Sequence, residues 1–476
     1  MSNNERAVKI VYVGAGSAAW AITIVRDLIV SKDLSNIELV FVDIDEDKLK
    51  NTTKLAKRYN EITGGKLKIS MNDRLDKALI DADFVINSVL AGKGHSLQEK
   101  VRKVSEDLGY YRGIESREFN MVSDYATLYA ATDQYQYISD LVNKLHDIAP
   151  DAWLFNVSNP MFELQTLILR KNMTKSVSYC DGTLHALDIA KFFGANPPNV
   201  HLQMAGINHN IWLTEFSIDG EDQYPKIDDW VKNHSESYYR NDKFYNTYDP
   251  NIDIHDISQH VQFSKVAVDM YQNFGLFPVG DTVRSGTWKY HYDLETKKRW
   301  YGPYGGFDSE IGWKKYLDHI AINNNKLRDL SEMDKGTILN EIPPKMGDDP
   351  VVPFIVAILF DKKTRAHLDI RNMNVDEKII PYLPENVAVE VPVSIDRHGI
   401  HPEKVVNLNE RIIKEVLLPR TVNMEIALDA FNTGSRDVLL NALYLDPRTR
   451  SDEQAEETLE RVLNLPENAS AAKLFR

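Results

Sequence analysis

The chain has 476 residues, more than a single compact core usually accommodates, so two fused lobes are expected. Its formal net charge of −14 argues against nucleic acid and anionic membrane surfaces as partners, because both are bound by clustered lysine and arginine. No run of about 18 apolar residues occurs and no apolar leader is present near residue 1, so we expect a cytoplasmic protein.

The first half of the chain alternates short apolar runs with amphipathic stretches. Short β-branched runs are typical of buried strands, and the segments between them have helical periodicity. This alternation predicts βαβ units and an α/β fold with a Rossmann-type doubly wound parallel sheet over residues 1–200. The strands are expected at residues 8–13, 37–42, 82–87 and 153–158, and the helices up to residue 31, over about 45–63 and over about 123–148.

The second half, residues 201–476, is less regular and predicts a mixed α+β domain for substrate, metal and subunit contacts, as in a lactate/malate-dehydrogenase-like architecture. Residues 275–315 combine glycine, aromatic and charged residues with little periodicity, which predicts an ordered loop region over a site. Residues 321–350 are the expected surface insertion. Strands are expected at 200–206, 211–216 and 387–393, a helix at 257–274, and helices from about residue 435.

A glycine-rich turn follows the first expected strand. Gly14-x-Gly16-x-x-Ala19 lies between a strand and a helix, which is the context that a dinucleotide-binding turn needs. Asp43 ends the second strand, where a carboxylate accepts hydrogen bonds from the adenosine ribose and so favours NAD over NADP. Asn87, which ends the third strand, is expected beside the nicotinamide ribose or as a turn residue. A structural turn with an acidic strand end is the alternative to dinucleotide binding.

The single cysteine is a candidate metal ligand. Cys180 and His209 are 29 residues apart, and a thiolate and an imidazole from two chain points can hold a divalent ion that keeps open positions for substrate. A small buried cysteine and a hydrogen-bonded core histidine are the alternatives. A Rossmann-type domain without a metal would instead indicate a 2-hydroxy-acid or malate-type dehydrogenase, or a non-catalytic NAD-binding regulator.

Seven segments spread along the chain carry a family resemblance. They are Gly14-Ala-Gly-Ser17, Tyr110-Tyr-Arg-Gly-Ile with Glu118-Phe-Asn-Met-Val-Ser-Asp124-Tyr, Asn159-Pro-Met-Phe-Glu163, Cys180-Asp181, Ala205-Gly-Ile-Asn-His209, Pro278-Val-Gly-Asp281-Thr-Val-Arg284 and Ile400-His-Pro-Glu-Lys. Together they resemble glycoside hydrolase family 4, the NAD- and manganese-dependent glycosidases, and most of all its α-glucosidase branch, which acts on unphosphorylated sugars. This family departs from the two-carboxylate scheme of most glycosidases.

The resemblance implies a glycosidase that uses NAD as a catalyst. Oxidation at C3 of the sugar acidifies the C2 proton, a base removes this proton, the glycosidic oxygen leaves, water adds at C1 and the hydride returns. The divalent cation, Mn²⁺ by the resemblance, acts as a Lewis acid on the O2 and O3 oxygens of the sugar. The resemblance also implies a homodimer or a homotetramer.

The resemblance assigns roles to residues of this chain. Cys180 and His209 are the implied metal ligands, Asp281 matches the base at C2, and Asp181 matches the general acid at the leaving oxygen. The cofactor-binding residues are expected to be Gly14, Gly16, Ser17, Asp43 and Asn87. The sugar is expected to be bound by Asp124, Asn159, Asn208 and Arg284.

Two positions depart from the patterns of the family's branches. The α-glucosidase branch has His directly after the metal cysteine, where this chain has Asp181, and the phospho-sugar branch typically has Pro where this chain has Thr183. We expect hydrolysis of unphosphorylated, maltose-like α-glucosides, with 6-phospho-α-glucosides, α-galactosides and α-uronides as alternatives. A uronate would need cationic contacts, which Arg112, Arg117 and Arg284 could supply.

Overall fold

The strands join into a single sheet of 13 strands in the computed structural model, which describes residues 6–114, 128–195 and 199–475. The strands are β1 (Val8–Val13), β2 (Ile37–Val42), β3 (Lys68–Asn72), β4 (Phe84–Asn87), β5 (Trp153–Asn156), β6 (Lys175–Ser178), β7 (Val200–Ile207), β8 (Asn210–Ile218), β9 (Glu221–Asp222), β10 (Phe277–Val279), β11 (Thr364–Arg371), β12 (Ala388–Asp396) and β13 (Gly399–Pro402). Their order is β10-β8-β7-β12-β11-β6-β5-β4-β1-β2-β3, with β13 beside β12 and β9 beside β8.

Helices connect and cover these strands. Those of the first half are α1 (Ala18–Val30), α2 (Glu46–Ile62), α3 (Leu75–Leu79), α4 (His95–Asp107), α6 (Leu128–Ile148), α7 (Met161–Lys171) and α8 (Gly182–Phe192). Those of the middle are α9 (Tyr224–Asp229), η1 (Trp230–His234), α10 (Ser235–Asn241), α11 (Lys243–Asn246), α12 (Ile254–Gln262), α13 (Lys265–Phe274), η2 (Gly280–Val283), α14 (Trp288–His291), α15 (Leu294–Tyr301), α16 (Glu310–Leu330), α17 (Lys335–Glu341) and α18 (Val351–Phe360). The last are α19 (Glu410–Ile412), η3 (Ile413–Leu417), α20 (Leu418–Thr433), α21 (Arg436–Tyr444), α22 (Asp452–Leu463), η4 (Pro466–Asn468) and α23 (Ala469–Leu474).

The N-terminal half of the sheet is parallel, in the order β3-β2-β1-β4-β5-β6. This is the strand order of a dinucleotide-binding doubly wound sheet. β1, β2 and β4 consist mainly of valine, isoleucine and aromatic residues whose side chains are buried, as expected of strands covered on both faces. The predicted Rossmann-type sheet is therefore confirmed.

The C-terminal half continues the same sheet with antiparallel strands. β11 pairs with β6 through Asp369 and Ser178, and β7 pairs with β12 through Gly206 and Glu390. The buried apolar side chains of both halves belong to one cluster. A mixed second half was expected, but its continuity with the parallel half was not, and the division at residue 200 stays a prediction.

Three segments differ from the expected helices and loops. The helix predicted over residues 257–274 is two helices, because Ser264 has an extended backbone, with ψ of 167°, and starts α13. Residues 275–315, predicted as a loop, contain α14, α15 and the start of α16. Residues 321–330 of the predicted surface insertion are mostly exposed and belong to the 21-residue helix α16, and the insertion stays a prediction.

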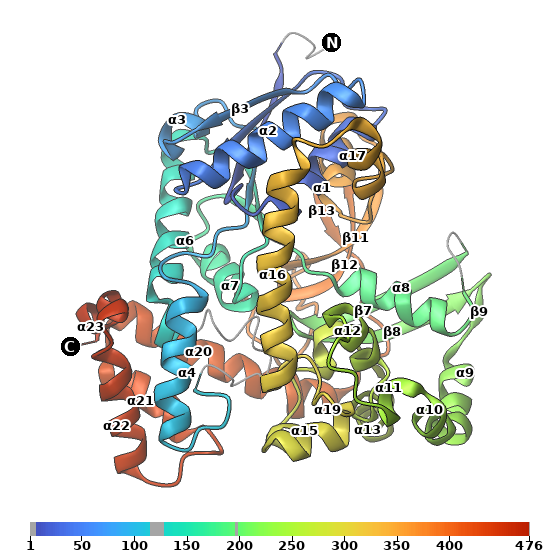
Figure 1. Ribbon diagram of the computed structural model, residues 1–476, viewed down its shortest axis with the longest axis vertical. Helices are drawn as coiled ribbons and strands as arrows, with labels where there is room; N and C mark the ends of the chain where they lie inside the picture. Colours follow the sequence, from blue (N-terminus) through green and yellow to red (C-terminus); the bar gives the residue numbers. More distant parts are fainter. Residues whose placement is uncertain (1–5, 115–127, 196–198, 476) are drawn as a thin grey trace.

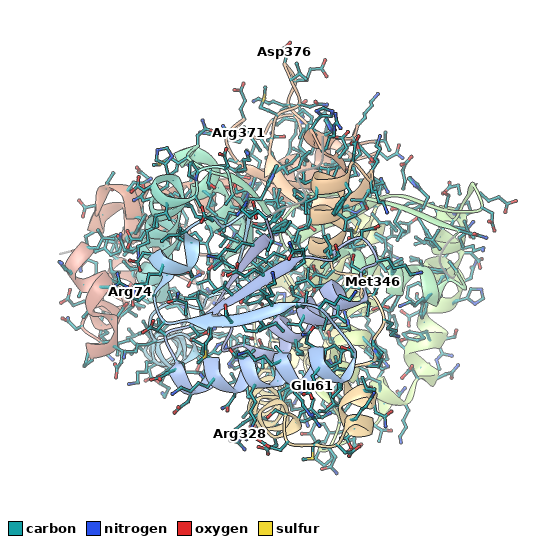
Figure 2. All side chains as sticks on the ribbon, turned by 90° about the horizontal axis from the view of Figure 1, so that it is seen from above. Glu61, Arg74, Arg328, Met346, Arg371 and Asp376 are labelled. Atoms are coloured by element: carbon teal, nitrogen blue, oxygen red, sulfur yellow. The ribbon has the colours of Figure 1, made fainter. Side chains whose placement is uncertain are left out.

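The helices surround the sheet unevenly. The long helix α16 runs beside α2 at one end and beside α12 towards the other, and the C-terminal helices α22 and α23 pack against α4 and α6 (Figure 1). Figure 2 shows side chains on both sides of the sheet, with Glu61 of α2 and Arg328 of α16 at the same outer surface. Within the described ranges, no helix combines the length and the apolar composition that a membrane span requires.

Candidate active site

The predicted dinucleotide turn has the geometry that its two glycines require. Gly14 has a φ of +91°, and a Cβ there would lie 2.9 Å from the carbonyl carbon of Ser88. A Cβ on Gly16 would lie 2.7 Å from Oδ2 of Asp43, which accepts a 2.7 Å hydrogen bond from the Gly16 amide. Ser17 is the N-cap residue of α1. The turn therefore presents bare backbone at a helix N-terminus beside a carboxylate, which fits a dinucleotide.

Asn87 lies next to this turn, because it pairs in register with Val13, the last residue of β1. Its buried amide group donates to Oδ1 of Asn156 at 2.9 Å and to Oγ of Ser158 at 3.0 Å, and accepts from the Tyr137 hydroxyl at 2.8 Å. These bonds fix the orientation of Asn87. Its contact with the nicotinamide ribose stays a prediction.

The fold brings Cys180 and His209 together, with Sγ 3.9 Å from Nε2. His209 occupies the turn between β7 and β8 with a φ of +65°, and Cys180 lies between β6 and α8. The first residue of α8, Gly182, packs closely on β8, since a Cβ there would lie 2.5 Å from Cδ1 of Ile211. This close approach of helix and strand places the thiol beside the imidazole.

Asp281 joins the same cluster, with Oδ2 3.4 Å from Nε2 of His209. Arg284 donates a 2.7 Å hydrogen bond to the other oxygen of Asp281 and two hydrogen bonds, of 2.8 and 2.7 Å, to the carboxylate of Asp308. The guanidinium also lies over the ring of Phe307, 4.2 Å from its centroid. Arg284 is thus buried between two carboxylates, and its predicted sugar contact stays a prediction.

The short helix η2 that carries Asp281 is tied to two neighbouring elements. Gln262, the last residue of α12, accepts from the Gly280 amide at 2.7 Å and donates to the Pro278 carbonyl at 3.0 Å. The Thr282 hydroxyl accepts from the Ile211 amide at 2.7 Å and donates to its carbonyl at 2.8 Å. The loop is therefore fixed to α12 on one side and to β8 on the other.

The electrostatics of the cluster fit a divalent cation. Burial, and then the charges of Asp181, Asp281 and Glu390, raise the pKa of the Cys180 thiol well above its usual value, so a thiolate there needs a compensating positive charge. Burial lowers the pKa of His209, which keeps its imidazole neutral and able to coordinate. Cys180 and His209 are therefore a chemically consistent ligand pair, with Asp281 beside it.

Asp181 has the environment of a proton donor. It precedes α8 without using its carboxylate as a helix cap. Burial raises the pKa of Asp181; the charge of His185 opposes this shift and that of Asp281 adds to it. A carboxyl group that stays protonated at higher pH than usual can act as a general acid.

A buried pair of carboxyl groups supports the turn that carries His209. Asp369 and Glu390 are direct cross-strand partners, and their residues are 0% and 2% exposed. Glu390 accepts a long hydrogen bond, 3.5 Å, from Asn208, whereas neither carboxylate oxygen of Asp369 has a hydrogen-bond partner among the described residues. Burial raises the pKa of both groups, and the charge of Glu390 raises that of Asp369 further. Glu390 thereby anchors the residue that precedes His209.

Asp369→Asn is expected to flatten the pH dependence of stability. Because the pKa of Asp369 is raised in the folded protein, the folded state holds a proton that the unfolded chain releases above about pH 4, so stability is lost as pH rises through the folded pKa. The slope is at most about 1.4 kcal/mol per pH unit for one proton. Urea unfolding between about pH 5 and pH 8 measures it.

The control for this variant is Asp376→Asn, which changes an exposed aspartate in the connection between β11 and β12. We expect the wild type and Asp376→Asn to lose stability equally with rising pH, and Asp369→Asn to lose less. Equal slopes in all three proteins would mean that Asp369 ionises as it does in the unfolded chain.

The remaining predicted residues have mixed outcomes. Asn159 accepts from the Met161 amide at 3.3 Å and so helps to start α7, and its sugar contact stays a prediction. Asp124 and Arg117 lie outside the described residues. Arg112 is buried and donates to the Asp308 carbonyl at 3.2 Å.

Four supporting residues were missed by the sequence analysis: Gln262, Asp308, Asp369 and Glu390. A signal existed for Glu390, because a glutamate inside the apolar run Val387-Ala-Val-Glu-Val-Pro-Val is costly to bury without a purpose. No signal existed for Asp369, because β11 was not predicted.

Comparison with known proteins places the chain in one family. A family model described as "Family 4 glycosyl hydrolase" matches residues 9–191, and "Family 4 glycosyl hydrolase C-terminal domain" matches residues 204–449. An alpha-galacturonidase of Lachnoclostridium phytofermentans is 24% identical, covering 96% of this chain and 95% of that protein. An alpha-glucosidase of Erwinia rhapontici is 25% identical, covering 92% and 94%. The α-glucosidase branch is thus one of several branches among the relatives.

Solved structures share the fold. A 6-phospho-beta glucosidase from Thermotoga maritima, determined with manganese, NAD+ and glucose-6-phosphate, has a TM-score of 0.70 at 19% identity, covering 96% of this chain and 98% of that one. A lactate dehydrogenase from Eimeria maxima has a TM-score of 0.50 at 12% identity, covering 91% and 99%, which agrees with the predicted dehydrogenase-like architecture. Because the two family models together match most of its length, the chain belongs to family 4 of the glycosyl hydrolases.

Proposed function

We propose that the protein is an NAD- and divalent-cation-dependent glycosidase that cleaves unphosphorylated α-glycosides, with α-glucosides as its first candidate substrates. The observation that carries this proposal is the convergence of Cys180, His209 and Asp281, with separations of 3.9 and 3.4 Å from the imidazole Nε2. A 2-hydroxy-acid dehydrogenase, which oxidises its substrate without returning the hydride, does not require a thiolate and an imidazole as metal ligands. Family membership also argues against that alternative.

Two groups of residues would hold the cofactor and the cation. Gly14, Gly16, Ser17 and Asp43 would bind NAD, and Cys180 and His209 would bind Mn²⁺. Bound NAD supplies reversible hydride exchange with C3 of the sugar, and bound Mn²⁺ supplies Lewis acidity at the sugar oxygens. Solved 6-phospho-glucosidases of similar fold were determined with both groups, which supports this assignment.

The carboxyl groups of the chain would move the protons. Asp281, whose orientation is fixed by the 2.7 Å bond from Arg284, would take the proton from C2 of the sugar. Asp181, whose pKa is raised by burial, would give a proton to the glycosidic oxygen as it leaves. One carboxyl group that stays protonated and one that is held by an arginine have the different environments that an acid and a base require.

An α-galacturonide is the second candidate substrate. Alpha-galacturonidases of Lachnoclostridium phytofermentans and Thermoanaerobacter italicus are 24% and 23% identical to this chain. Lys297 of α15 is buried, and its ammonium group lies 3.0 Å from Nδ1 of His291. Burial lowers the pKa of Lys297 to about 8, and no ion pair of this ammonium occurs among the described residues, so a substrate carboxylate would suit it.

The test is cleavage of p-nitrophenyl α-glucoside, α-galactoside, α-galacturonide and the 6-phosphate of the first, each with and without NAD+, Mn²⁺ and a thiol reductant. We expect cleavage of an unphosphorylated substrate only when NAD+ and Mn²⁺ are both present. Cleavage without NAD+, or NADH accumulating in proportion to substrate, would contradict the proposal. Lys297→Met separates the two candidates, because it should abolish cleavage of the galacturonide and leave that of the glucoside nearly unchanged.

A further inference from the structure

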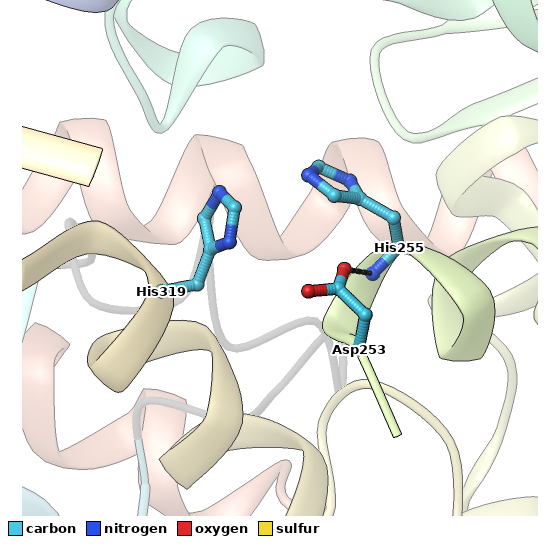
Figure 3. Close-up of side chains that lie close together, drawn as sticks. All are labelled: Asp253, His255 and His319. Atoms are coloured by element: carbon cyan, nitrogen blue, oxygen red, sulfur yellow. Dashed lines mark hydrogen bonds between the residues drawn. The ribbon is translucent and has the colours of Figure 1, made fainter. Parts of the chain in front are cut away.

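Two histidines and an aspartate gather on the surface at a place that the proposed reaction does not use. Asp253 directly precedes α12, His255 lies in the first turn of α12, and His319 projects from α16 (Figure 3). One donor atom of each side chain lies within 4.8 Å of those of the other two. The centroids of the two imidazole rings are 4.7 Å apart, and the ring planes make an angle of 85°. Figure 3 shows the carboxylate of Asp253 lying close to both rings.

We propose that Asp253, His255 and His319 form a second cation site, which takes a divalent transition metal of the Zn²⁺ type. Two imidazoles and one carboxylate are a donor set found in zinc sites with open positions. With metal–donor bonds of about 2.0–2.2 Å, the donors of a tetrahedral ion stand roughly 3.4 Å apart. The donor atoms, which lie within 4.8 Å of one another, therefore need to approach by up to about 1.4 Å, which rotation of side chains at the surface can supply.

Contacts outside the cluster hold the donors close to one another. One oxygen of Asp253 accepts from the His255 amide at 2.8 Å and so caps α12, which leaves its second oxygen for a cation. Lys315 of α16 donates to the carbonyls of Pro250 and Ile252 at 2.8 and 2.9 Å. These bonds fix the segment that carries Asp253 against the helix that carries His319.

The donors are also available to a cation. Across the ranges that the structure describes, no lysine or arginine pairs with Asp253, and neither imidazole has a hydrogen-bond partner. Asp253 and His255 are exposed and His319 is half-buried, so a hydrated ion can enter from solvent and keep water in its remaining positions.

A cation at this site would join two helices that support the active-site loop. α12 ends in Gln262, which binds the Gly280 amide at 2.7 Å. α16 begins two residues after Asp308, which holds Arg284. Linking α12 to α16 would therefore stabilise the supports of Asp281 without touching the sugar.

The test counts bound Zn²⁺ in full-length protein carrying Cys180→Ser, which removes the thiol ligand of the other candidate site. Equilibrium dialysis against Zn²⁺ alone is expected to show one ion per chain, together with a higher unfolding temperature. Adding His255→Gln or His319→Gln should abolish both effects. Adding His398→Gln, at an exposed histidine between β12 and β13, should leave both unchanged. No uptake in the parent protein, or equal uptake in all four proteins, would overturn the proposal.

Discussion

Replacing Cys180 by serine is expected to lower kcat/KM for the best glycoside by about a thousandfold or more. A serine hydroxyl stays protonated at neutral pH and is a poor ligand, so the cation would lose one of its two protein donors. Lewis-acid stabilisation contributes several kcal/mol, and about 1.4 kcal/mol corresponds to a tenfold change in rate. Steady-state cleavage with saturating NAD+ and Mn²⁺, together with the affinity for Mn²⁺, measures the effect.

Histidine variants provide the matched comparison. His209→Gln should lose activity and Mn²⁺ affinity to a similar extent, because its Nε2 lies 3.9 Å from the Cys180 sulfur. His201→Gln changes an exposed histidine on β7, close to His209 in sequence, and should retain both. If Cys180→Ser kept wild-type activity and Mn²⁺ response, the thiol would not be a ligand.

Asp281→Asn is expected to reduce kcat by roughly 10²–10⁴, the usual contribution of a positioned general base. The amide keeps the shape of the carboxylate and leaves the two bonds between Arg284 and Asp308, of 2.8 and 2.7 Å, in place. Stability should therefore change much less than turnover. Comparison of kcat with the free energy of unfolding separates the two effects.

Asp308→Asn is the control for a structural role. It removes the carboxylate that accepts two hydrogen bonds from Arg284. Breaking a buried ion pair lowers the free energy of unfolding by about 3–5 kcal/mol. We expect this variant to lose stability more than Asp281→Asn does. If Asp281→Asn were equally destabilised and kept its turnover, Asp281 would be a structural partner of Arg284 and not a base.

Much of the parallel half of the sheet could be predicted, because its apolar runs in the sequence are also the strands that are buried in the fold. β1, β2 and β4 are short apolar runs with buried side chains, so hydrophobicity alone marks them. β3 lies at the edge, with mostly exposed side chains, and lacks that signal. The break between α12 and α13 depends on the backbone of Ser264 within a continuous amphipathic pattern.

The chemically unusual residues of the site could also be proposed from sequence, whereas their supports could not. The single cysteine, Cys180, and His209 in the segment Ala205-Gly-Ile-Asn-His209 have side chains that can bind a metal, so they can be recognised from the sequence. Glu390 and Asp369 matter because two strands pair in register, and Asp308 matters because it reaches Arg284 across α14 and α15. Such partners are set by the tertiary structure, which local pattern does not encode.

The most direct test of proton abstraction from C2 of the sugar is hydrolysis in D₂O, with mass spectrometry and NMR of the released sugar and a no-enzyme control. We expect the product to carry deuterium at C2, because C2 loses its proton and then takes a deuteron from solvent. No NADH should accumulate, because the hydride returns to the sugar. Full cleavage with only hydrogen at C2 would contradict this route.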